Sequence, residues 1–248
     1  MLFWWPAYRV PSEHPRLSAE ELSYIHDGQE AEVAPTARVG WGQLLRYRQT
    51  WTFLIGKFMT DGVWWFYLFW LPKFLDARYG IALGKLALPI VVIYLLADVG
   101  SVGGGWLSGW LIERGWPVAK ARKTALLIAA LLIVPTAAAP LAPSLWVAVT
   151  LVSIAAAAHQ WWSANLFTTA SDMFPRHAVG SVVGLGGFAG AAGGFLFQRL
   201  TGRILEATGS NYVPVFLICG SAYVTALFII NLLSPRMEPV SLSPSNGK

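Results

Sequence analysis

Long apolar runs follow one another along most of the chain, separated by short turns that contain charged residues, Gly or Pro. Most of these runs reach the roughly 20 residues that an α-helix needs to cross the hydrocarbon core of a membrane. They lack the alternating period of a membrane β-barrel, and backbone in lipid must satisfy its own hydrogen bonds. The pattern predicts an all-α membrane fold with six transmembrane helices, at residues 51–77, 86–112, 124–139, 145–174, 179–205 and 213–233.

Two prolines predict irregular helices within this pattern. Pro72 follows the aromatic run of the first segment and is expected to end or bend that helix. Pro135 interrupts the third segment, which the sequence APLAPS follows. Because proline is tolerated in membrane helices, we still count the third segment as a crossing.

Composition supports a membrane protein. Hydrophobic residues make up 55% of the chain and charged residues 12%, against about 25% charged residues in soluble domains. The single cysteine, Cys219, lies inside an apolar run, cannot form a disulfide within the chain and is expected in the core.

The basic residues indicate an orientation. With the N-terminus in the cytoplasm, the inner group is Arg9, Arg16, Arg38, Arg46, Arg48, Arg114, Lys120, Arg122, Lys123, Arg176, Arg236 and Lys248, and the outer group is Lys73, Arg78, Lys85, Arg199 and Arg203. This inward excess predicts that both termini are cytoplasmic. A basic face with interleaved aromatic residues outside the spans is lacking, so the net charge of +5 does not indicate a nucleic-acid partner.

The polar N-terminal region divides the chain. Residues 1–49 begin with MLFWWPAYRVP, which is too short to span, lacks the features of a signal peptide and is similar to the tail of a preceding helix. In the cytoplasmic linker that follows, Ser18 and Glu21 have the spacing of a helix capping box. We expect the six-helix region at residues 50–234 and a cytoplasmic tail at residues 235–248.

The first span contains two opposite charges one helical turn apart. Lys57 and Asp61 are at i and i+4, within pairing reach. A Lys or Asp at mid-membrane costs about 2.5 to 3.5 kcal/mol on insertion scales, so we expect the pair to serve a solute path. An incoming carboxylate can compete for the ammonium. The alternative is a structural ion pair whose Lys57 extends to the headgroups.

Aromatic side chains add candidates for binding a sugar. Trp64 and Tyr67 of the first span are candidates to stack on a sugar ring, with lipid or helix packing as the alternative. In the fourth span, Trp161, Asn165 and Thr168 fall on one helical stripe that Asp172 extends, as expected of a helix that faces a wet cavity.

Asn165 is the first candidate on this stripe. An amide can donate to a carboxylate and accept from a hydroxyl, which suits a sugar acid. The alternative for Asn165 is a hydrogen bond between helices.

Five further ionisable residues are candidates for proton coupling or for gating. His159 can relay protons because imidazole titrates near physiological pH, or it can be a packed, hydrogen-bonded residue. Asp98 is either a coupling site or a partner of a neighbouring helix. Asp172 adjoins the sequence MFPRH, and we expect it to cap a helix or to pair with Arg176 or the loop. Glu113 and Arg114 complete this group, at the end of the second span.

Several apparent motifs do not support an enzyme. GSVVGLGGFAGAAGGF resembles a dinucleotide fingerprint, but it lies inside an apolar run that no strand precedes. Its Gly186, Gly190 and Gly194 recur every four residues, so another helix can approach closely. YGIALGKL has Tyr79 where a phosphate-binding loop requires its first Gly. We see no Cys/His metal set and no nucleophile elbow, and we expect no enzyme activity, cofactor or metal.

Four stretches resemble a known family: YRVPSEHPRLSAEEL, KFMTDGVWWFYLFWLPKFL, GWLIERGWPVAKARK and AAHQWWSANLFTTASDMFPRHAVGSVVGLGGFAGAAGGF. Together they are similar to the C-terminal six-helix half of a major facilitator superfamily transporter, and more narrowly to the anion:cation symporters that include bacterial hexuronate transporters. One motif departs from the superfamily's cytoplasmic signature. Gly115 follows Glu113 and Arg114 at once, and the basic group begins only at Lys120.

The resemblance implies proton-coupled symport of an anionic sugar such as a hexuronate, by alternating access, in a bacterial inner membrane. It also implies a missing N-terminal six-helix half, which would supply an Arg for the substrate carboxylate and an acidic proton carrier. Four alternatives stay open: another organic anion or a drug on the same fold, an intramembrane enzyme, a six-helix channel, and a nonfunctional truncated fragment.

Overall fold

A computed structural model describes residues 8–26, 39–81 and 83–242 of the chain. Its α-helices and 3-10 helices (η) are η1 Pro11–Glu13, α2 Ala19–His26, α3 Trp41–Leu44, α4 Arg48–Phe69, α5 Leu71–Tyr79, η2 Leu83–Lys85, α6 Ala87–Glu113, α7 Val118–Ile133, η3 Val134–Leu141, α8 Leu145–Met173, α9 Arg176–Ala207 and α10 Val213–Leu233. The described residues form no strand, which confirms the all-α fold class.

The chain divides into two compact units, one formed by residues 39–243 and the other by residues 1–38 with 244–248. In the second unit, Ser18 and Glu21 form the predicted capping box at the start of α2. The Ser18 N–H donates to Glu21 Oε2 at 2.9 Å, and the Glu21 N–H donates to Ser18 Oγ at 3.1 Å. These hydrogen bonds favour the carboxylate and lower the pKa of Glu21. The first seven residues of the predicted helix remnant lie outside the described residues.

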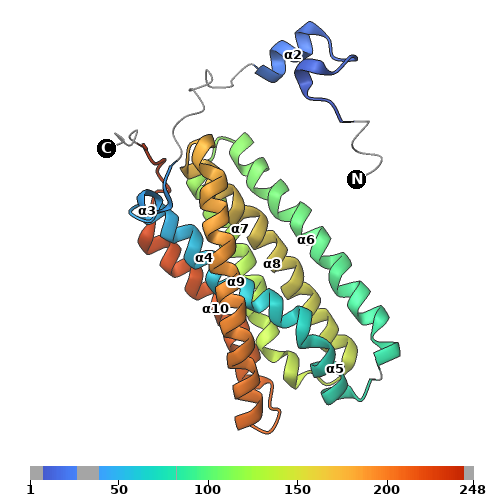
Figure 1. Ribbon diagram of the computed structural model, residues 1–248. Coiled ribbons are helices and arrows are strands. Elements are labelled where there is room, and N and C mark those ends of the chain that lie inside the picture. The colour runs from blue at the N-terminus through green and yellow to red at the C-terminus, as the bar shows by residue number, and fades with distance from the viewer. Residues whose placement is uncertain (1–7, 27–38, 82, 243–248) are drawn as a thin grey trace. The chain divides into compact units, whose positions relative to one another are not determined.

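The larger unit is a bundle of six long helices (Figure 1). In the described part of the chain, five segments are long and apolar enough to cross a membrane: α6, α7 with η3, α8, α9 and α10. The sixth, α4, falls outside this group because charged and polar side chains lower its hydropathy. It nevertheless packs against α8, α9 and α10. The structure thus has six long helices at the six predicted transmembrane segments, and five of them meet the length and hydropathy of a membrane span.

The two prolines act as predicted. Helix α4 ends at Phe69, and α5 begins at Leu71 with Pro72 in its first turn. At Pro135 the third segment changes from α7 to the 3-10 helix η3, since proline has no N–H to donate within an α-helix. The third crossing thus extends over Val118–Leu141, beyond the predicted ends.

Glycines set how closely the helices pack. The main partner of α4 is α9, and that of α6 is α8. A Cβ at Gly193 of α9 would lie 2.0 Å from the Phe58 carbonyl oxygen of α4. A Cβ at Gly100 of α6 would lie 2.0 Å from the Ala157 carbonyl oxygen of α8. Only glycine permits such contacts between backbones.

The predicted glycine face of α9 is confirmed in large part. Gly186 and Gly190 meet Phe53 and Asp61 of α4 so closely that a Cβ would be only 2.1 Å from each side chain. A Cβ at Gly194 would lie 3.3 Å from the Trp65 ring of α4, a tight contact, and its neighbour Gly193 makes the closest approach. The sequence pattern therefore identified the correct helix face.

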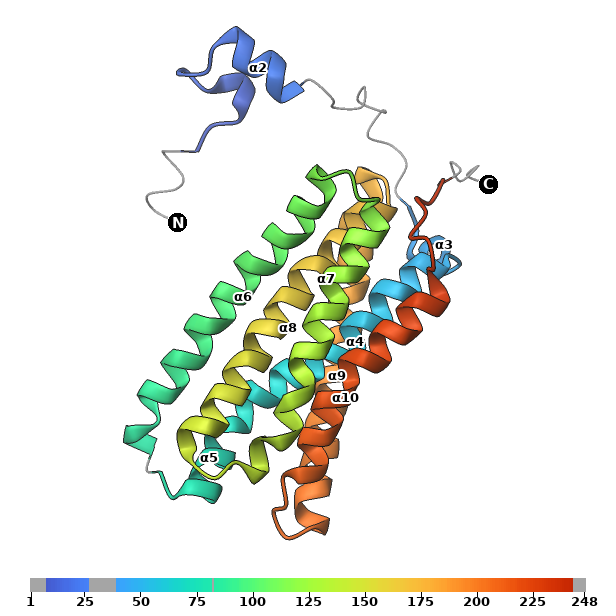
Figure 2. The same cartoon turned by 180° about the vertical axis from the view of Figure 1, so that it is seen from behind.

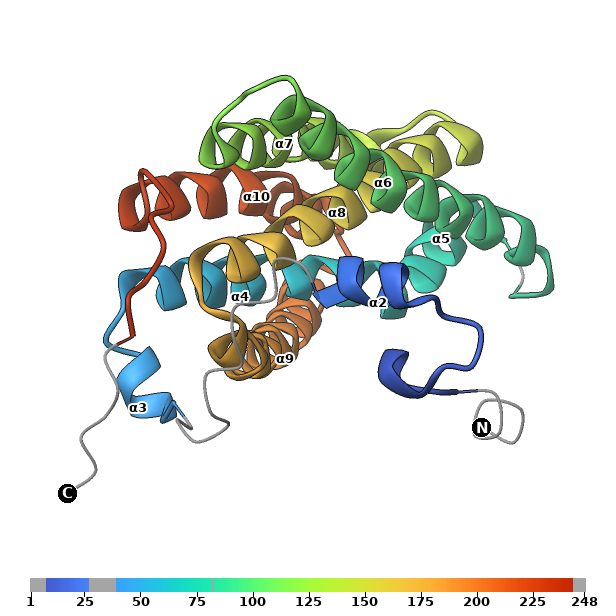
Figure 3. The ribbon, with the colours of Figure 1, turned by 90° about the horizontal axis from the view of Figure 1, so that it is seen from above.

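The order of the helices places α4 and α8 innermost. In Figure 3, which views the bundle from above, α8 and α4 lie between α7 on one side and α9 on the other, and the contacts α7 with α8, α8 with α4 and α4 with α9 agree. Helices α7 and α10 also touch, as Figure 2 shows from behind. Side chains that α4 and α8 direct toward each other can therefore form one site.

Candidate functional site

The charged pair of α4 is buried and intact. Lys57 Nζ lies 2.8 Å from Asp61 Oδ2, and the two side chains are 9% and 17% exposed. The same ammonium lies 4.5 Å from the ring centroid of Phe167 on α8. On the other side Gly190 of α9 leaves room for the carboxylate. The ammonium is therefore held by a carboxylate of α4 and an aromatic face of α8.

Next to this pair, Trp64 joins three helices through aromatic contacts. Its indole stacks on His159 of α8 with ring centroids 4.8 Å apart and planes 9° apart. It also meets Tyr94 of α6 edge to face at 5.9 Å. Trp64 is half-buried, so part of its indole is not covered by these contacts.

His159 is buried and hydrogen-bonded, as one of the two interpretations expected. Its Nδ1 lies 2.6 Å from the Tyr223 hydroxyl, which also donates to the Thr60 carbonyl at 3.3 Å. A hydroxyl has a single hydrogen, so when Tyr223 donates to Thr60, the Nδ1–H of His159 must donate to Tyr223. The tautomer of His159 is thus linked to the backbone of α4.

The stripe on α8 requires a correction. Asn165 is 1% exposed, and its Nδ2 donates to the Gly104 carbonyl of α6 and to the Trp161 carbonyl, both at 3.0 Å. The stripe therefore faces α6 rather than an open cavity, because Gly100 and Gly104 let α6 cover it. Asn165 makes the hydrogen bond between helices that was its alternative.

Two buried polar atoms of this stripe have no hydrogen-bond partner. They are the Nε1 donor of Trp161 and the Oδ1 acceptor of Asn165, one helical turn apart. Trp161 and Thr168 are half-buried, and the Thr168 hydroxyl donates to the Asn165 carbonyl at 2.7 Å. Buried polar atoms without partners are unfavourable, so these two atoms carry a cost in this structure.

Asp172 has a different partner from the one predicted. Arg122 of α7 donates through Nε to Asp172 Oδ2 at 2.9 Å, whereas we expected Arg176 or the loop. The Nη1 of Arg122 donates to Ser108 Oγ of α6 at 2.7 Å. One guanidinium therefore joins the ends of α6, α7 and α8.

The remaining candidates lie apart from these contacts. Tyr67 is buried, and its hydroxyl donates to Thr136 of η3 at 3.4 Å. Asp98 is exposed on α6, one turn beyond Tyr94 and on the same helix face. Glu113 and Arg114 are exposed where α6 ends. The described residues contain no group of three His, Cys, Asp or Glu able to hold a metal ion.

Comparison with known proteins identifies the family. The model of the Major Facilitator Superfamily matches residues 1–198. The chain belongs to the Major Facilitator Superfamily. This membership accounts for the apolar helices of the bundle, and the chain is a multi-pass membrane protein.

Several relatives of this chain are named for sugar acids. It is 31% identical over 219 residues to a hexuronate transporter of Escherichia coli K12, covering 87% of this chain and 50% of the relative. It is 27% identical over 244 residues to a D-galactonate transporter of Escherichia coli O6:H1, covering 94% and 54%. A probable galactarate/D-glucarate transporter of Escherichia coli K12 is 27% identical, covering 95% and 56%. The chain thus spans about half the length of the curated relatives it matches.

A solved structure supports the fold of this facilitator. The match is a bacterial homologue of the human lysosomal transporter Spinster, in an inward-facing and unoccupied conformation, with a TM-score of 0.53 and 18% identity. The alignment covers 95% of this chain and 55% of that one. The fold is therefore half of a major facilitator fold.

Several residues at this site could not be singled out from the sequence. Phe167, Tyr94 and Tyr223 contribute ring or hydroxyl contacts, but each is one of many aromatic residues in apolar runs. Arg122 was counted only as a charge in a basic loop, although its place at the start of a helix could have indicated a partner inside the bundle.

Proposed function

We propose that this chain provides one half of a secondary transporter that imports an anionic sugar, with a hexuronate as the first candidate, together with protons. The observation that carries the proposal is the buried Lys57–Asp61 pair, with Phe167 on one side. The relatives named above for hexuronate, galactonate and galactarate or glucarate support it, because these molecules share a carboxylate and several hydroxyls.

The ion pair offers a physical route to coupling. A substrate carboxylate that binds the Lys57 ammonium displaces Asp61, which then loses its counter-charge in a buried position. An unpaired buried carboxylate is unfavourable, so Asp61 takes up a proton when the substrate binds. Substrate and proton therefore occupy the site together, as symport requires.

The sugar hydroxyls find their partners on α8. For a sugar hydroxyl to accept from Trp161 Nε1 and donate to Asn165 Oδ1, the two buried atoms without partners, α6 has to move away from this stripe during the transport cycle. The half-buried face of Trp64 can pack against the ring. Thr168 and Tyr67 stay candidates for further contacts, and His159, Asp98, Glu113, Arg114 and Asp172 stay candidates for coupling or gating.

A second six-helix half completes the site in this account, on the same polypeptide or on another. Such a half would close the substrate between two repeats, and rocking of one half against the other would expose the substrate to each side in turn. We place the transporter in a bacterial inner membrane with both termini in the cytoplasm, because the basic loops favour that orientation. Transport rather than catalysis is the activity we assign.

Uptake of labelled glucuronate or galacturonate, by cells that express the chain together with a second half, tests this function. Lys57→Ala is expected to reduce uptake about tenfold or more, since Lys57 is the cation that we assign to the substrate carboxylate among the described residues. Lys73→Ala is the matched control, because Lys73 is an exposed lysine of α5. Unchanged uptake by Lys57→Ala at equal expression would remove the proposal.

The same uptake assay shows whether another class of organic anion, and not a sugar acid, is the substrate. Excess unlabelled galactonate, glucarate or a non-sugar carboxylate competes with the labelled hexuronate in proportion to its affinity. If a non-sugar anion competed strongly and hexuronate uptake were weak, the substrate class would be that non-sugar anion and not a sugar acid.

A further inference from the structure

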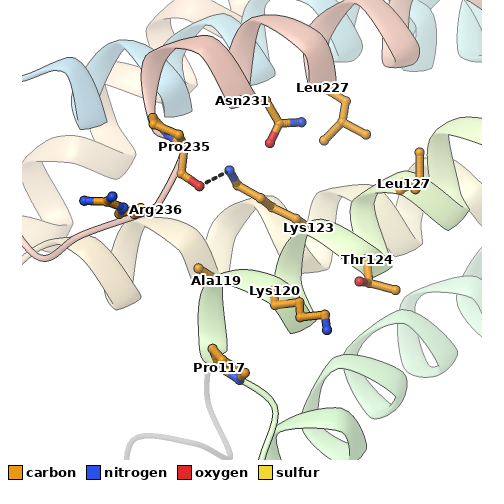
Figure 4. Close-up of a pocket in the computed structure, with 10 residues that line it drawn as sticks. All are labelled: Pro117, Ala119, Lys120, Lys123, Thr124, Leu127, Leu227, Asn231, Pro235 and Arg236. Carbon is orange, nitrogen blue, oxygen red and sulfur yellow. Dashed lines mark hydrogen bonds between the residues drawn. The ribbon is translucent and has the colours of Figure 1, made fainter.

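A cationic pocket lies between α7 and α10, at the end of the bundle where α7 begins and α10 ends. Its volume is about 590 Å³. Figure 4 shows Lys120 and Lys123 of α7 on one side and Arg236, just beyond α10, on the other. Among the described residues, the lining contains these three cations and no acidic residue. The pocket is separate from the Lys57–Asp61 pair.

The positive charges of this pocket are only weakly compensated. Lys123 Nζ donates to the neutral carbonyl of Pro235 at 2.6 Å. Lys120 Nζ lies 4.4 Å from the centroid of the Trp116 ring. Arg236 approaches Glu238 at 3.6 Å with side chains 84% and 66% exposed, and such surface pairs contribute little. The pocket thus presents a positive potential to an anionic ligand.

Apolar side chains continue from the pocket along both helices. Leu127 of α7 and Leu227 of α10 line it. Leu131, one turn beyond Leu127, is exposed, and so are Phe228 and Val224 on the corresponding face of α10. The pocket thus has cations at its opening and a strip of exposed apolar side chains along α7 and α10, which together would suit a molecule with an anionic headgroup and hydrocarbon chains. Inorganic phosphate would use only the cations at the opening.

We propose that this pocket binds the phosphodiester headgroup of an anionic phospholipid, whose acyl chains lie along the strip formed by α7 and α10. The hydroxyl of Thr124 and the amide of Asn231, both in the lining, can donate to headgroup oxygens. Basic pockets between transmembrane helices are known to hold such headgroups, whereas a zwitterionic lipid lacks the net charge. The lipid would join α7 to α10 on the side of the bundle away from α9.

Lipid binding to the purified full chain in neutral detergent tests this proposal. Native mass spectrometry with added phosphatidylglycerol should show saturable binding, and phosphatidylcholine and inorganic phosphate should not compete. Lys120→Gln and Arg236→Gln should each weaken phosphatidylglycerol binding about fivefold, equivalent to about 1 kcal/mol per cation. The double variant should bind phosphatidylglycerol about 25-fold more weakly.

Two control variants and one further test variant show whether the lipid binds at this pocket. Lys73→Gln and Arg199→Gln remove exposed cations elsewhere on the bundle and should bind the lipid as the unmodified chain does. Leu127→Gln keeps the cations but interrupts the apolar strip, so it should weaken binding of the lipid. Unchanged binding by the Lys120 and Arg236 double variant, or equal binding of phosphatidylcholine or of inorganic phosphate, would overturn the proposal.

Discussion

At the scale of single residues, the buried Lys57–Asp61 pair is the feature that most needs a function. Removing one partner of a buried ion pair leaves an uncompensated charge and costs about 3 to 5 kcal/mol, whereas replacing both with apolar residues is often neutral. The pair is therefore poor evidence for stability. Its presence in an apolar helix is therefore consistent with the ligand site that we propose for it.

A double-mutant cycle separates these roles. We expect Lys57→Met alone to lower the unfolding free energy by about 3 to 5 kcal/mol, and Lys57→Met with Asp61→Leu to recover most of that loss. Thermal unfolding of the purified protein in detergent measures both. The double variant should nevertheless be inactive in uptake. If the loss of stability in the double variant equalled the sum of the losses in the two single variants, Lys57 and Asp61 would not stabilise each other as a buried ion pair.

At the scale of elements, glycine faces decide which helices pair. The tight contacts of α4 with α9 and of α6 with α8 both rest on glycines at which a Cβ would collide with the facing helix. Because Asp61 and Asn165 lie in these contacts, the glycines also position the candidate site.

Two glycines of α9 test this point. Gly193→Ala would place a Cβ 2.0 Å from the Phe58 carbonyl oxygen and should destabilise the bundle by about 1 to 3 kcal/mol. Gly187→Ala is the matched control, because nothing lies within 4 Å of its Cβ position, and it should be neutral or slightly stabilising. Melting temperatures in detergent compare the two. Equal melting temperatures would show that α4 and α9 are not tightly packed.

Many features of the individual helices could be predicted from the sequence. Long apolar runs gave the helices, Pro72 and Pro135 gave the breaks, and the i, i+4 spacing gave the Lys57–Asp61 pair. These features depend on neighbours along the chain. Apolar length and local spacing are both visible in a single sequence.

The contacts between helices could not be predicted in the same way. Helical periodicity places Asn165 and Asp172 on one stripe, but it does not say which helix covers that stripe. The Arg122–Asp172 pair and the stacking of Trp64 on His159 join residues far apart in the sequence. The glycines of α6 were a signal for the close contact over Asn165.

At the scale of the whole molecule, this half of a major facilitator fold has its ionisable site on the innermost helices. The Arg122 guanidinium joins α6, α7 and α8 at one end, and the pocket between α7 and α10 lies at the same end of α7. In the proposed cycle these contacts keep the half rigid while it moves against its partner half.

Orientation in the membrane is testable at this scale. With Cys219 replaced by Ser, a cysteine at Ala77 of α5 should react with a membrane-impermeant maleimide in intact cells. A cysteine at Arg114, where α6 ends, should react only after permeabilisation. Both positions are exposed, so accessibility depends on the side of the membrane alone. The reverse pattern would place the basic loops outside and contradict the orientation we propose.

The most direct test of the central claim compares two kinds of transport by Asp61→Asn in proteoliposomes that contain the complete carrier. If Asp61 takes the proton when a substrate carboxylate binds Lys57, this variant should still exchange labelled for unlabelled glucuronate. It should fail to accumulate glucuronate against its gradient when a proton gradient is applied. Proton-driven accumulation by Asp61→Asn at the unmodified level would contradict the account.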